Sequence, residues 1–378
     1  MFFGLRYVTS HPLYELHKAV ECFFKCCLTA DAFNVECFPE WFRPVINNSW
    51  RLRNRFKKIA ALLKEQSEET RQNVYEAFQN NNQIKHLCTD SSSPLKSFDN
   101  RLVDLHKEIK GLFKYLYDKT INTNVFIESL SGASIKDHYI EFRKINGSVC
   151  PFCGIADYPD EDSGARAAYD HYLPRAHYPF AGVNFENLVP MCTTCNERPN
   201  KGSKDVLFTS TKRNERREAF YPYGEHRGIK LLISRKKKPT ANDIRGKWNV
   251  SLTAVRKSDE AKVQTWNAVF RVCARLEARV RGHNVFWIRY DILPHIEKSD
   301  CNEYNLRKAL KKQAKALSDP EAMRVRSGSL LQKAFFDYLA NNADKEEVES
   351  YCEIALTPYM AVMASQGATL LKDVLDNS

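Results

Sequence analysis

The order of apolar and polar residues predicts helices along most of the first 145 positions. In residues 13–28 apolar side chains recur three to four positions apart with few breakers, which is typical of an amphipathic helix. Residues 68–80 are rich in helix-forming side chains, and a further short helix is expected over residues 134–145. The polar stretch 80–94, with its Asn, Ser and Pro residues, is expected to be a loop.

The clearest helical signal runs from residue 98 to residue 116. Apolar residues in this segment recur at alternating steps of four and three: Phe98, Leu102, Leu105, Ile109, Leu112 and Leu116. Such a stripe can pack against another helix of the same chain or form a dimer seam. Because the segment is shorter than three heptads, packing within the chain is the default expectation.

The last third of the chain predicts a small β element followed by helices. Residues 230–234 and 247–255 favour a β-hairpin, with the basic tip 235–239 between them. Residues 261–283 are expected to form one long helix, whose Arg271, Arg275 and Arg279 recur every four positions as a cationic stripe. Three more helices are expected, at residues 302–319, 329–342 and 344–356.

Two Cys-x-x-Cys pairs stand in the middle of the chain, at Cys150/Cys153 and Cys192/Cys195. One such pair can be a redox motif, but two pairs separated by 38 residues are typical of one tetrahedral Zn²⁺ site of the structural kind. The other eight cysteines form no second set of this type. Among them Cys22, Cys26 and Cys27 lie at helical spacing beside apolar residues and are expected to be small buried hydrophobes.

Four polar residues inside and just after the cysteine frame suggest catalysis. Asp170 and His171 are adjacent, Asn187 follows, and Asn196 comes directly after the last cysteine. A histidine has the intrinsic pKa of a general base, and carboxylate and amide oxygens suit Mg²⁺ or Mn²⁺. Asn187 is better placed to orient the histidine than to bind metal. Taken singly, each residue has an ordinary structural explanation, and only the ordered set points to hydrolysis of a phosphodiester.

This set, DHYLPR…NLVPMCTTCN with an upstream CPFC, resembles the HNH endonucleases of the ββα-metal type with four zinc cysteines. The resemblance implies that a β-hairpin carries Asp170 and His171, a loop carries Asn187, and a helix carries Asn196. It implies that Asp170 and Asn196 bind one catalytic Mg²⁺ or Mn²⁺, that His171 is the general base, and that Asn187 positions it. The four cysteines would hold structural zinc. The likeness covers a central window and leaves the flanking helical regions unassigned.

The sequence departs from that family in one place. Many relatives have a lysine three residues after the Cys-Asn pair, where this chain has Pro199, and its lysines come later, at Lys201 and Lys204. The phosphate-contacting lysine is therefore left open. Arg175 and His177, just past the Asp-His pair, can contact phosphate or cap the hairpin. The candidate nucleic-acid contacts are Arg175, Lys201, Lys204, Lys212, Arg213, Arg216 and Arg217.

The placement of charge supports a polyanionic partner. The chain carries a net charge of +11, and residues 201–281 hold 21 Lys/Arg against 8 Asp/Glu, an excess of 13 that accounts for all of it. Each phosphate that a cation contacts releases counterions, so a basic segment beside a candidate active site favours nucleic acid. Double-stranded DNA is the expected substrate, and a solvated basic face with no ligand is the alternative.

The chain lacks the roughly 18 uninterrupted apolar residues that a membrane span needs, and its N-terminus lacks a signal-peptide pattern. A cytoplasmic protein without a membrane partner is expected, with cysteines that are reduced or metal-bound. The expected fold is an α-rich α+β protein. It has a helical region at 1–145 that could serve as a partner or dimer interface, a ββα-metal zinc module at 146–227, and a basic hairpin with helices at 228–378.

The function that follows is a DNA endonuclease, and two alternatives stay open. One is a non-catalytic, zinc-stabilised nucleic-acid-binding protein. The other is a nuclease subunit that is active only with an ATPase partner, because the chain resembles HNH subunits of bacterial anti-phage defence systems. The sequence has no Walker A motif, so nucleotide control would have to come from that partner. One active site cuts one strand, so a double-strand break would need a homodimer or two successive nicks.

Overall fold

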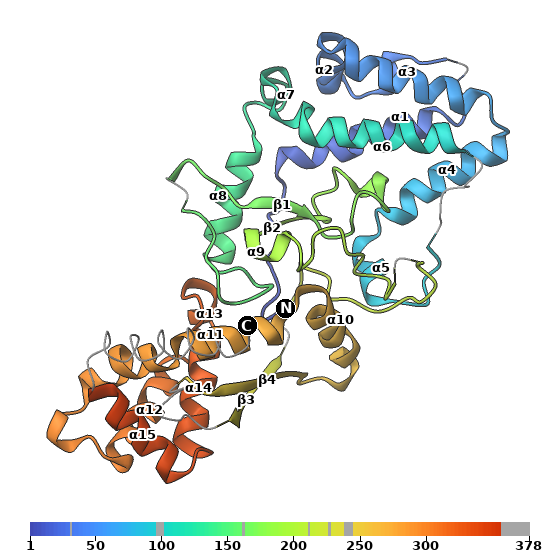
Figure 1. Ribbon diagram of the computed structural model, residues 1–378. Coiled ribbons are helices and arrows are strands. Elements are labelled where there is room, and N and C mark those ends of the chain that lie inside the picture. The colour runs from blue at the N-terminus through green and yellow to red at the C-terminus, as the bar shows by residue number, and fades with distance from the viewer. Residues whose placement is uncertain are drawn as a thin grey trace, which may run out of the picture.

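The computed structural model describes residues 1–30, 32–95, 102–160, 163–210, 212–225, 228–237 and 245–356. Within these ranges the chain is rich in helix and has two small antiparallel sheets of two strands each. The N-terminal helices gather at one end and the C-terminal helices at the opposite end, with β1 and β2 between them (Figure 1). The predicted α-rich α+β class is confirmed at this level.

The N-terminal region is built from short and medium helices with clear polar caps. Ser49 and Ser67 each accept a backbone N–H at a helix start, and Ser134 forms a capping box with Asp137. The helices are α1 (Glu15–Cys26), α2 (Arg43–Asn48), α3 (Trp50–Lys64), α4 (Glu68–Asn81), α5 (Ile84–Thr89), α6 (Val103–Asp118), α7 (Asn124–Ser129) and α8 (Ile135–Asn146).

Most of the helices expected in this region are present, and one expected loop is not. α1, α4 and α8 confirm the helices predicted over residues 13–28, 68–80 and 134–145. The prediction of a loop over residues 80–94 is wrong in its middle, where α5 buries Ile84, Leu87 and Cys88. These three lie on one helical face, and burying them outweighs the polar character of their neighbours.

The apolar stripe of α6 packs inside the chain. Leu105, Ile109, Leu112 and Leu116 are at most 2% exposed, and the helix lies against α3. Packing within the chain, rather than a dimer seam, is therefore confirmed for this stripe. The first residue of the predicted stripe, Phe98, lies outside the described residues.

The central module follows the order strand, strand, helix. β1 (Ala168–His171) pairs antiparallel with β2 (Leu188–Met191), so that Asp170 faces Val189 and His171 faces Leu188 across the ladder. The short helix α9 (Thr193–Asn196) follows β2 directly. The resemblance implied a β-hairpin for Asp170 and His171 and a helix for Asn196, and the structure has these residues on β1 and on α9.

The C-terminal region begins with the predicted hairpin and continues as helices. Its elements are β3 (Ile229–Lys237), β4 (Lys247–Ala254), α10 (Glu260–Phe270), α11 (Val272–Trp287), α12 (Glu303–Ala316), α13 (Ala322–Val325), α14 (Ser329–Asn341) and α15 (Lys345–Leu356). Strand β3 includes the start of the basic tip, and residues 238–244 lie outside the described ranges.

The single long helix predicted over residues 261–283 is wrong, because the chain breaks at Arg271. This residue takes a left-handed conformation (φ 53°) that ends α10 and begins α11. The Asn267 side chain accepts the backbone N–H of Cys273 and so satisfies a donor in the first turn of α11. Arg271 therefore does not continue a straight stripe with Arg275 and Arg279.

Segments from both flanking regions attach to the central module, and one hydrophobic cluster runs through all three ranges. The backbone N–H of Phe2 donates to the carbonyl of Pro151 (3.1 Å). The Trp266 indole donates to the carbonyl of Phe152 (3.0 Å). The described parts of the ranges 1–145, 146–227 and 228–378 thus share one hydrophobic cluster.

The cysteines of α1 differ from the expectation. Cys26 forms a disulfide with Cys37, whose Cα lies 5.8 Å away, and Cys22 is exposed, so only Cys27 is the small buried hydrophobe that was predicted. A 3₁₀ turn at Val35–Cys37 returns the chain to the end of α1, which local spacing could not show. Separately, none of the helices in the described ranges is long and apolar enough to cross a membrane.

The packing of α6 predicts a position-dependent loss of stability. Leu112→Ala should lower the free energy of unfolding by about 2–5 kcal/mol, because it leaves a cavity in a fully buried stripe. Val103→Ala, at a residue 67% exposed on the same helix, should change it by less than about 0.5 kcal/mol. Urea unfolding followed by circular dichroism measures both, and equal losses would contradict the packing of this helix.

Candidate active site

The two cysteine pairs meet in one cluster. The sulfur atoms of Cys150, Cys153, Cys192 and Cys195 all lie within 4.8 Å of one another. Two of the sulfur–sulfur distances, Cys150 to Cys195 and Cys153 to Cys192, are 3.9 Å. A tetrahedral zinc with Zn–S bonds of about 2.3 Å requires sulfurs about 3.8 Å apart. The predicted four-cysteine site is confirmed as a cluster that can hold such a metal.

A tight turn positions each cysteine pair so that the four sulfur atoms lie together. In the first turn the N–H groups of Cys153 and Gly154 both donate to the carbonyl of Cys150. Gly154 has φ +67°, and a Cβ there would lie 2.8 Å from the Phe2 ring, so only glycine fits. In the second turn the N–H of Cys195 donates to the carbonyl of Cys192 (3.0 Å).

The electrostatics of the four-cysteine cluster favour a bound cation. Burial raises the pKa of the Cys150 and Cys195 thiols well above their ordinary value, whereas hydrogen bonds from the neighbouring sulfurs lower the pKa of Cys153. Arg275 of α11 donates to the sulfur of Cys195 (3.1 Å). A divalent metal with four thiolates is a net anion, and this guanidinium offsets part of its charge. The sequence analysis placed Arg275 in a cationic stripe and did not predict this contact with Cys195.

His171 ends β1 in a nearly closed environment, with 9% of its surface exposed. Its Nε2 lies 3.0 Å from the carbonyl oxygen of Gly182, and because a carbonyl can only accept, Nε2 carries the hydrogen. Among the described residues nothing hydrogen-bonds Nδ1. The Tyr117 ring from α6 packs edge-on against the imidazole, with ring centroids 4.6 Å apart.

The same burial sets the charge of this histidine. Desolvation lowers the pKa of His171 to about 4, helped by the nearby cations Arg175 and Lys201 and opposed by the hydrogen bond to Gly182. The imidazole is therefore neutral at pH 7, with its proton on Nε2 and a lone pair on Nδ1. A group in this state can accept a proton.

Asp170 is paired with a buried lysine. The Nζ of Lys201 lies 2.6 Å from Oδ2 of Asp170 and also donates to the backbone carbonyl of His171 (2.8 Å). Lys201 is 1% exposed. Burial raises the pKa of Asp170, and the attraction of Lys201 opposes that rise. The sequence analysis named Lys201 as a nucleic-acid contact, whereas the structure places its ammonium inside, against the candidate metal ligand.

The two asparagines have different surroundings. Asn187 is fully buried and exchanges hydrogen bonds with the backbone of Leu173, accepting its N–H (2.7 Å) and donating to its carbonyl (3.0 Å). It also donates to the carbonyl of Ala181 (3.2 Å), next to the glycine that holds His171. Asn187 therefore fixes the β1–β2 loop rather than touching the imidazole. The Asn196 side chain makes no hydrogen bond within the described residues, so its oxygen is free to bind a cation.

The seven cationic candidates do not form one surface. Arg175 pairs with Asp118 at the end of α6 (2.9 Å), and Arg216 donates to the carbonyls of Leu87 and Asp90 near α5. These two arginines hold segments of the chain together. Lys212 is exposed. Lys204, Arg213 and Arg217 line a pocket beside Lys201.

Comparison with known proteins gives one partial likeness. The chain is 34% identical over 108 residues to "Protein ea31" of Escherichia phage lambda, a match that takes in 27% of this chain and 32% of that protein. No family model matches the chain. No solved structure matches it. The likeness spans about a third of the phage protein's length and assigns neither a family nor an activity.

The cysteine cluster predicts that metal and stability are lost together. The purified chain should contain one zinc ion, and Cys153→Ser should remove it and lower the free energy of unfolding by more than about 3 kcal/mol. Cys22→Ser, at an exposed cysteine outside the cluster, should leave both unchanged. Elemental analysis and thermal unfolding measure the two effects. Full zinc content in Cys153→Ser would contradict the four-sulfur site.

Proposed function

We propose that this chain is an endonuclease of the HNH kind that hydrolyses phosphodiester bonds in DNA, with His171 as the general base. One observation carries the proposal. The imidazole is buried and neutral, its Nε2 proton is donated to the carbonyl of Gly182, and its Nδ1 accepts no hydrogen bond from the described residues. A carboxylate, Asp170, precedes it on the same strand, within a module closed by four cysteines.

In the reaction, Nδ1 of His171 takes a proton from a water molecule as the water oxygen bonds to phosphorus. The bond from phosphorus to the leaving oxygen then breaks, and the leaving oxygen takes a proton from a solvent water. The hydroxide so formed is neutralised by the proton that His171 releases when the base is regenerated. The imidazolium formed at His171 keeps its Nε2–H···O bond to Gly182, which stabilises the added charge. Tyr117 and the β1–β2 loop hold the ring in place while the proton moves.

Asp170 and Asn196 are the residues that would hold Mg²⁺ or Mn²⁺, because both offer hard oxygen ligands. When bound, such an ion stabilises the charge on the phosphorane and on the leaving oxygen. The residue types fit this role, and the Asn196 side-chain amide makes no hydrogen bond to another described residue. However, Oδ2 of Asp170 already contacts the Lys201 ammonium at 2.6 Å, so a metal must share this carboxylate or displace the lysine.

That ion pair is also the observation that favours a second candidate function. If Lys201 satisfies Asp170 permanently, the module has no catalytic metal and serves as a zinc-stabilised nucleic-acid-binding protein. The role in anti-phage defence and the ATPase partner remain predictions from the resemblance. The cleavage experiment below separates the first two candidates.

The proposal predicts cleavage that depends on one histidine. Wild type should nick supercoiled plasmid DNA in Mg²⁺ or Mn²⁺, and His171→Ala should slow the reaction about 10²–10⁴-fold, the usual contribution of a general base. His295→Ala, at an exposed histidine in the C-terminal region, should cut at the wild-type rate. Zinc content is measured in all three proteins. Equal cleavage by wild type and His171→Ala would contradict the proposal, and binding without cleavage in wild type would favour the second candidate.

The lowered pKa of His171 predicts the acid limb of the pH profile. The base loses activity only when it is protonated, so the rate should fall with a midpoint near pH 4 rather than near 6.5. The unfolded chain binds this proton below about pH 6.5. The same group therefore contributes stability above pH 6.5 that is lost as the pH falls toward 4. Initial rates are taken only where circular dichroism shows folded protein, and a midpoint near 6.5 would mean that the imidazole is solvated.

A further inference from the structure

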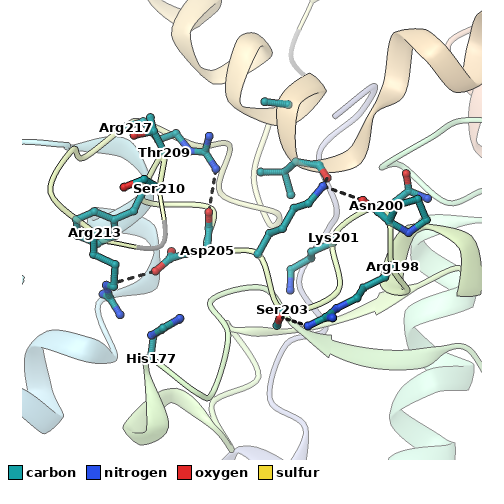
Figure 2. A pocket seen from close by; sticks show the side chains of 15 residues that line it. His177, Arg198, Asn200, Lys201, Ser203, Asp205, Thr209, Ser210, Arg213 and Arg217 are labelled. Carbon is teal, nitrogen blue, oxygen red and sulfur yellow. Dashed lines mark hydrogen bonds and ion pairs between the residues drawn. The ribbon is translucent and has the colours of Figure 1, made fainter.

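A pocket of about 590 Å³ lies beside the candidate active site (Figure 2). Four segments line it: the β1–β2 loop at His177, the loop after α9, the loop that contains Arg213, and the end of α10 at Ala268 and Val269. Its volume lies within the range of about 300–1,000 Å³ that is common for ligand sites. Lys201 also lines it, so the pocket borders the ion pair with Asp170.

The charges around this pocket are unbalanced. Five Lys or Arg side chains line it against one carboxylate, that of Asp205. The charge of Lys201 is offset by Asp170, which is not a lining residue. The other four cations are Arg198, Lys204, Arg213 and Arg217, and they outnumber the single acid.

The one acid is used to hold an arginine in place. The Asp205 carboxylate accepts hydrogen bonds from the Tyr178 hydroxyl (3.1 Å) and the backbone N–H of Leu207 (2.9 Å), and its side chain is 6% exposed. Arg213 lies 3.7 Å from it, donates to the Tyr178 hydroxyl (3.1 Å) and stacks over Phe208. Arg213 keeps this position although its φ is +54°, which few non-glycine residues adopt.

The remaining cations contact neutral acceptors, as Figure 2 shows in part. Lys204 donates to the carbonyls of Pro199 (2.8 Å) and Val269 (3.2 Å). Arg198 donates to the hydroxyl of Ser203 (3.4 Å), and Arg217 donates to backbone carbonyls. Burial lowers the pKa of Lys204 and of Arg217, and neighbouring arginines add to the effect on Lys204. Among the described lining residues, these four cations therefore exceed the one carboxylate, Asp205, by three charges.

We propose that this pocket binds a phosphate group of a nucleic-acid strand, next to the phosphodiester that is cut. The four cations suit phosphate oxygens. The Thr209 and Ser210 hydroxyls donate instead to Glu215 (2.7 Å) and to Asn214 (2.9 Å). The apolar walls at Val269 and Pro199 can accept a sugar. The choice of a nucleic-acid strand rests on the proposed function, whereas binding of phosphate rests on the pocket alone. A free nucleotide carries the same group and is the other source.

This assignment changes the predicted set of nucleic-acid contacts. It adds Arg198, which the sequence analysis did not select. It leaves out Arg175 and Arg216, because each holds another segment of the chain. The excess of Lys and Arg after residue 200 thus contributes to the proposed phosphate site and also to contacts that hold the fold together.

The test compares two charge-matched double variants of the full chain. Arg198→Gln with Lys204→Gln removes two pocket charges and keeps polar side chains. Lys136→Gln with Lys144→Gln removes two exposed charges from α8, outside the pocket lining. Anisotropy of a labelled DNA duplex, without added divalent metal, gives the Kd over a range of NaCl concentrations. Zinc content and melting temperature verify folding, and Arg198→Gln alone replaces the pocket variant if the double variant does not fold.

The pocket variant should raise the Kd for DNA about tenfold or more and lower the salt slope by about one to two, since each phosphate contact contributes about 0.9. The α8 variant should bind within about twofold of wild type. In a second arm, AMP and inorganic phosphate are tested by thermal shift. Stabilisation of wild type but not of the pocket variant, with unchanged DNA binding, would assign the site to a free nucleotide. If neither DNA nor AMP nor phosphate distinguishes the two variants, the proposal is overturned.

Plasmid cleavage by the same proteins separates this inference from the proposed function. Weak DNA binding by the pocket variant, together with a wild type that does not cleave, would support the phosphate site and contradict the proposed nuclease activity. Cleavage that depends on His171 but not on Arg198 and Lys204, with equal DNA binding by wild type and the pocket variant, would support the nuclease and contradict the site for a nucleic-acid phosphate.

Discussion

The architecture depends on the meeting of four buried cysteine sulfurs from two turns separated by 38 residues. The first turn precedes β1 and the second follows β2, so a bound metal would tie both ends of the β1–β2 hairpin to one point. The flanking regions attach to the same place: Phe2 and Trp266 bond the backbone of the first turn, and Arg275 bonds Cys195. A module this small has little core of its own, and such cross-links compensate for that.

The helical N-terminal region helps to build the candidate active site. Tyr117 packs on His171, and Asp118 pairs with Arg175 in the loop after β1, both from the end of α6. The stability of α6, which is set by its buried stripe, therefore bears on the position and the pKa of the imidazole. An interface role for this region, which the resemblance suggests, would have to be served by its other surfaces.

The sequence predicted what depends on local spacing and missed what depends on long-range contacts. The two Cys-x-x-Cys turns and most helices follow from short patterns, whereas the strand–strand–helix order came from the resemblance. The pairing of Lys201 with Asp170, the contact of Tyr117 with His171 and the disulfide between Cys26 and Cys37 join separate segments, and periodicity carries no information about them. The break at Arg271 was missed for another reason: a left-handed arginine inside an apolar pattern leaves no sequence signal.

The central claim is that the fold holds the His171 imidazole in its neutral form with the proton on Nε2. Histidine-selective ¹⁵N NMR of the zinc-loaded protein, with His171→Ala used for assignment, measures that state most directly. The account predicts that at pH 7 the Nε2 of His171 is protonated and its Nδ1 is not, with titration near pH 4. An imidazolium at pH 7, or a neutral ring with its proton on Nδ1, would contradict the account.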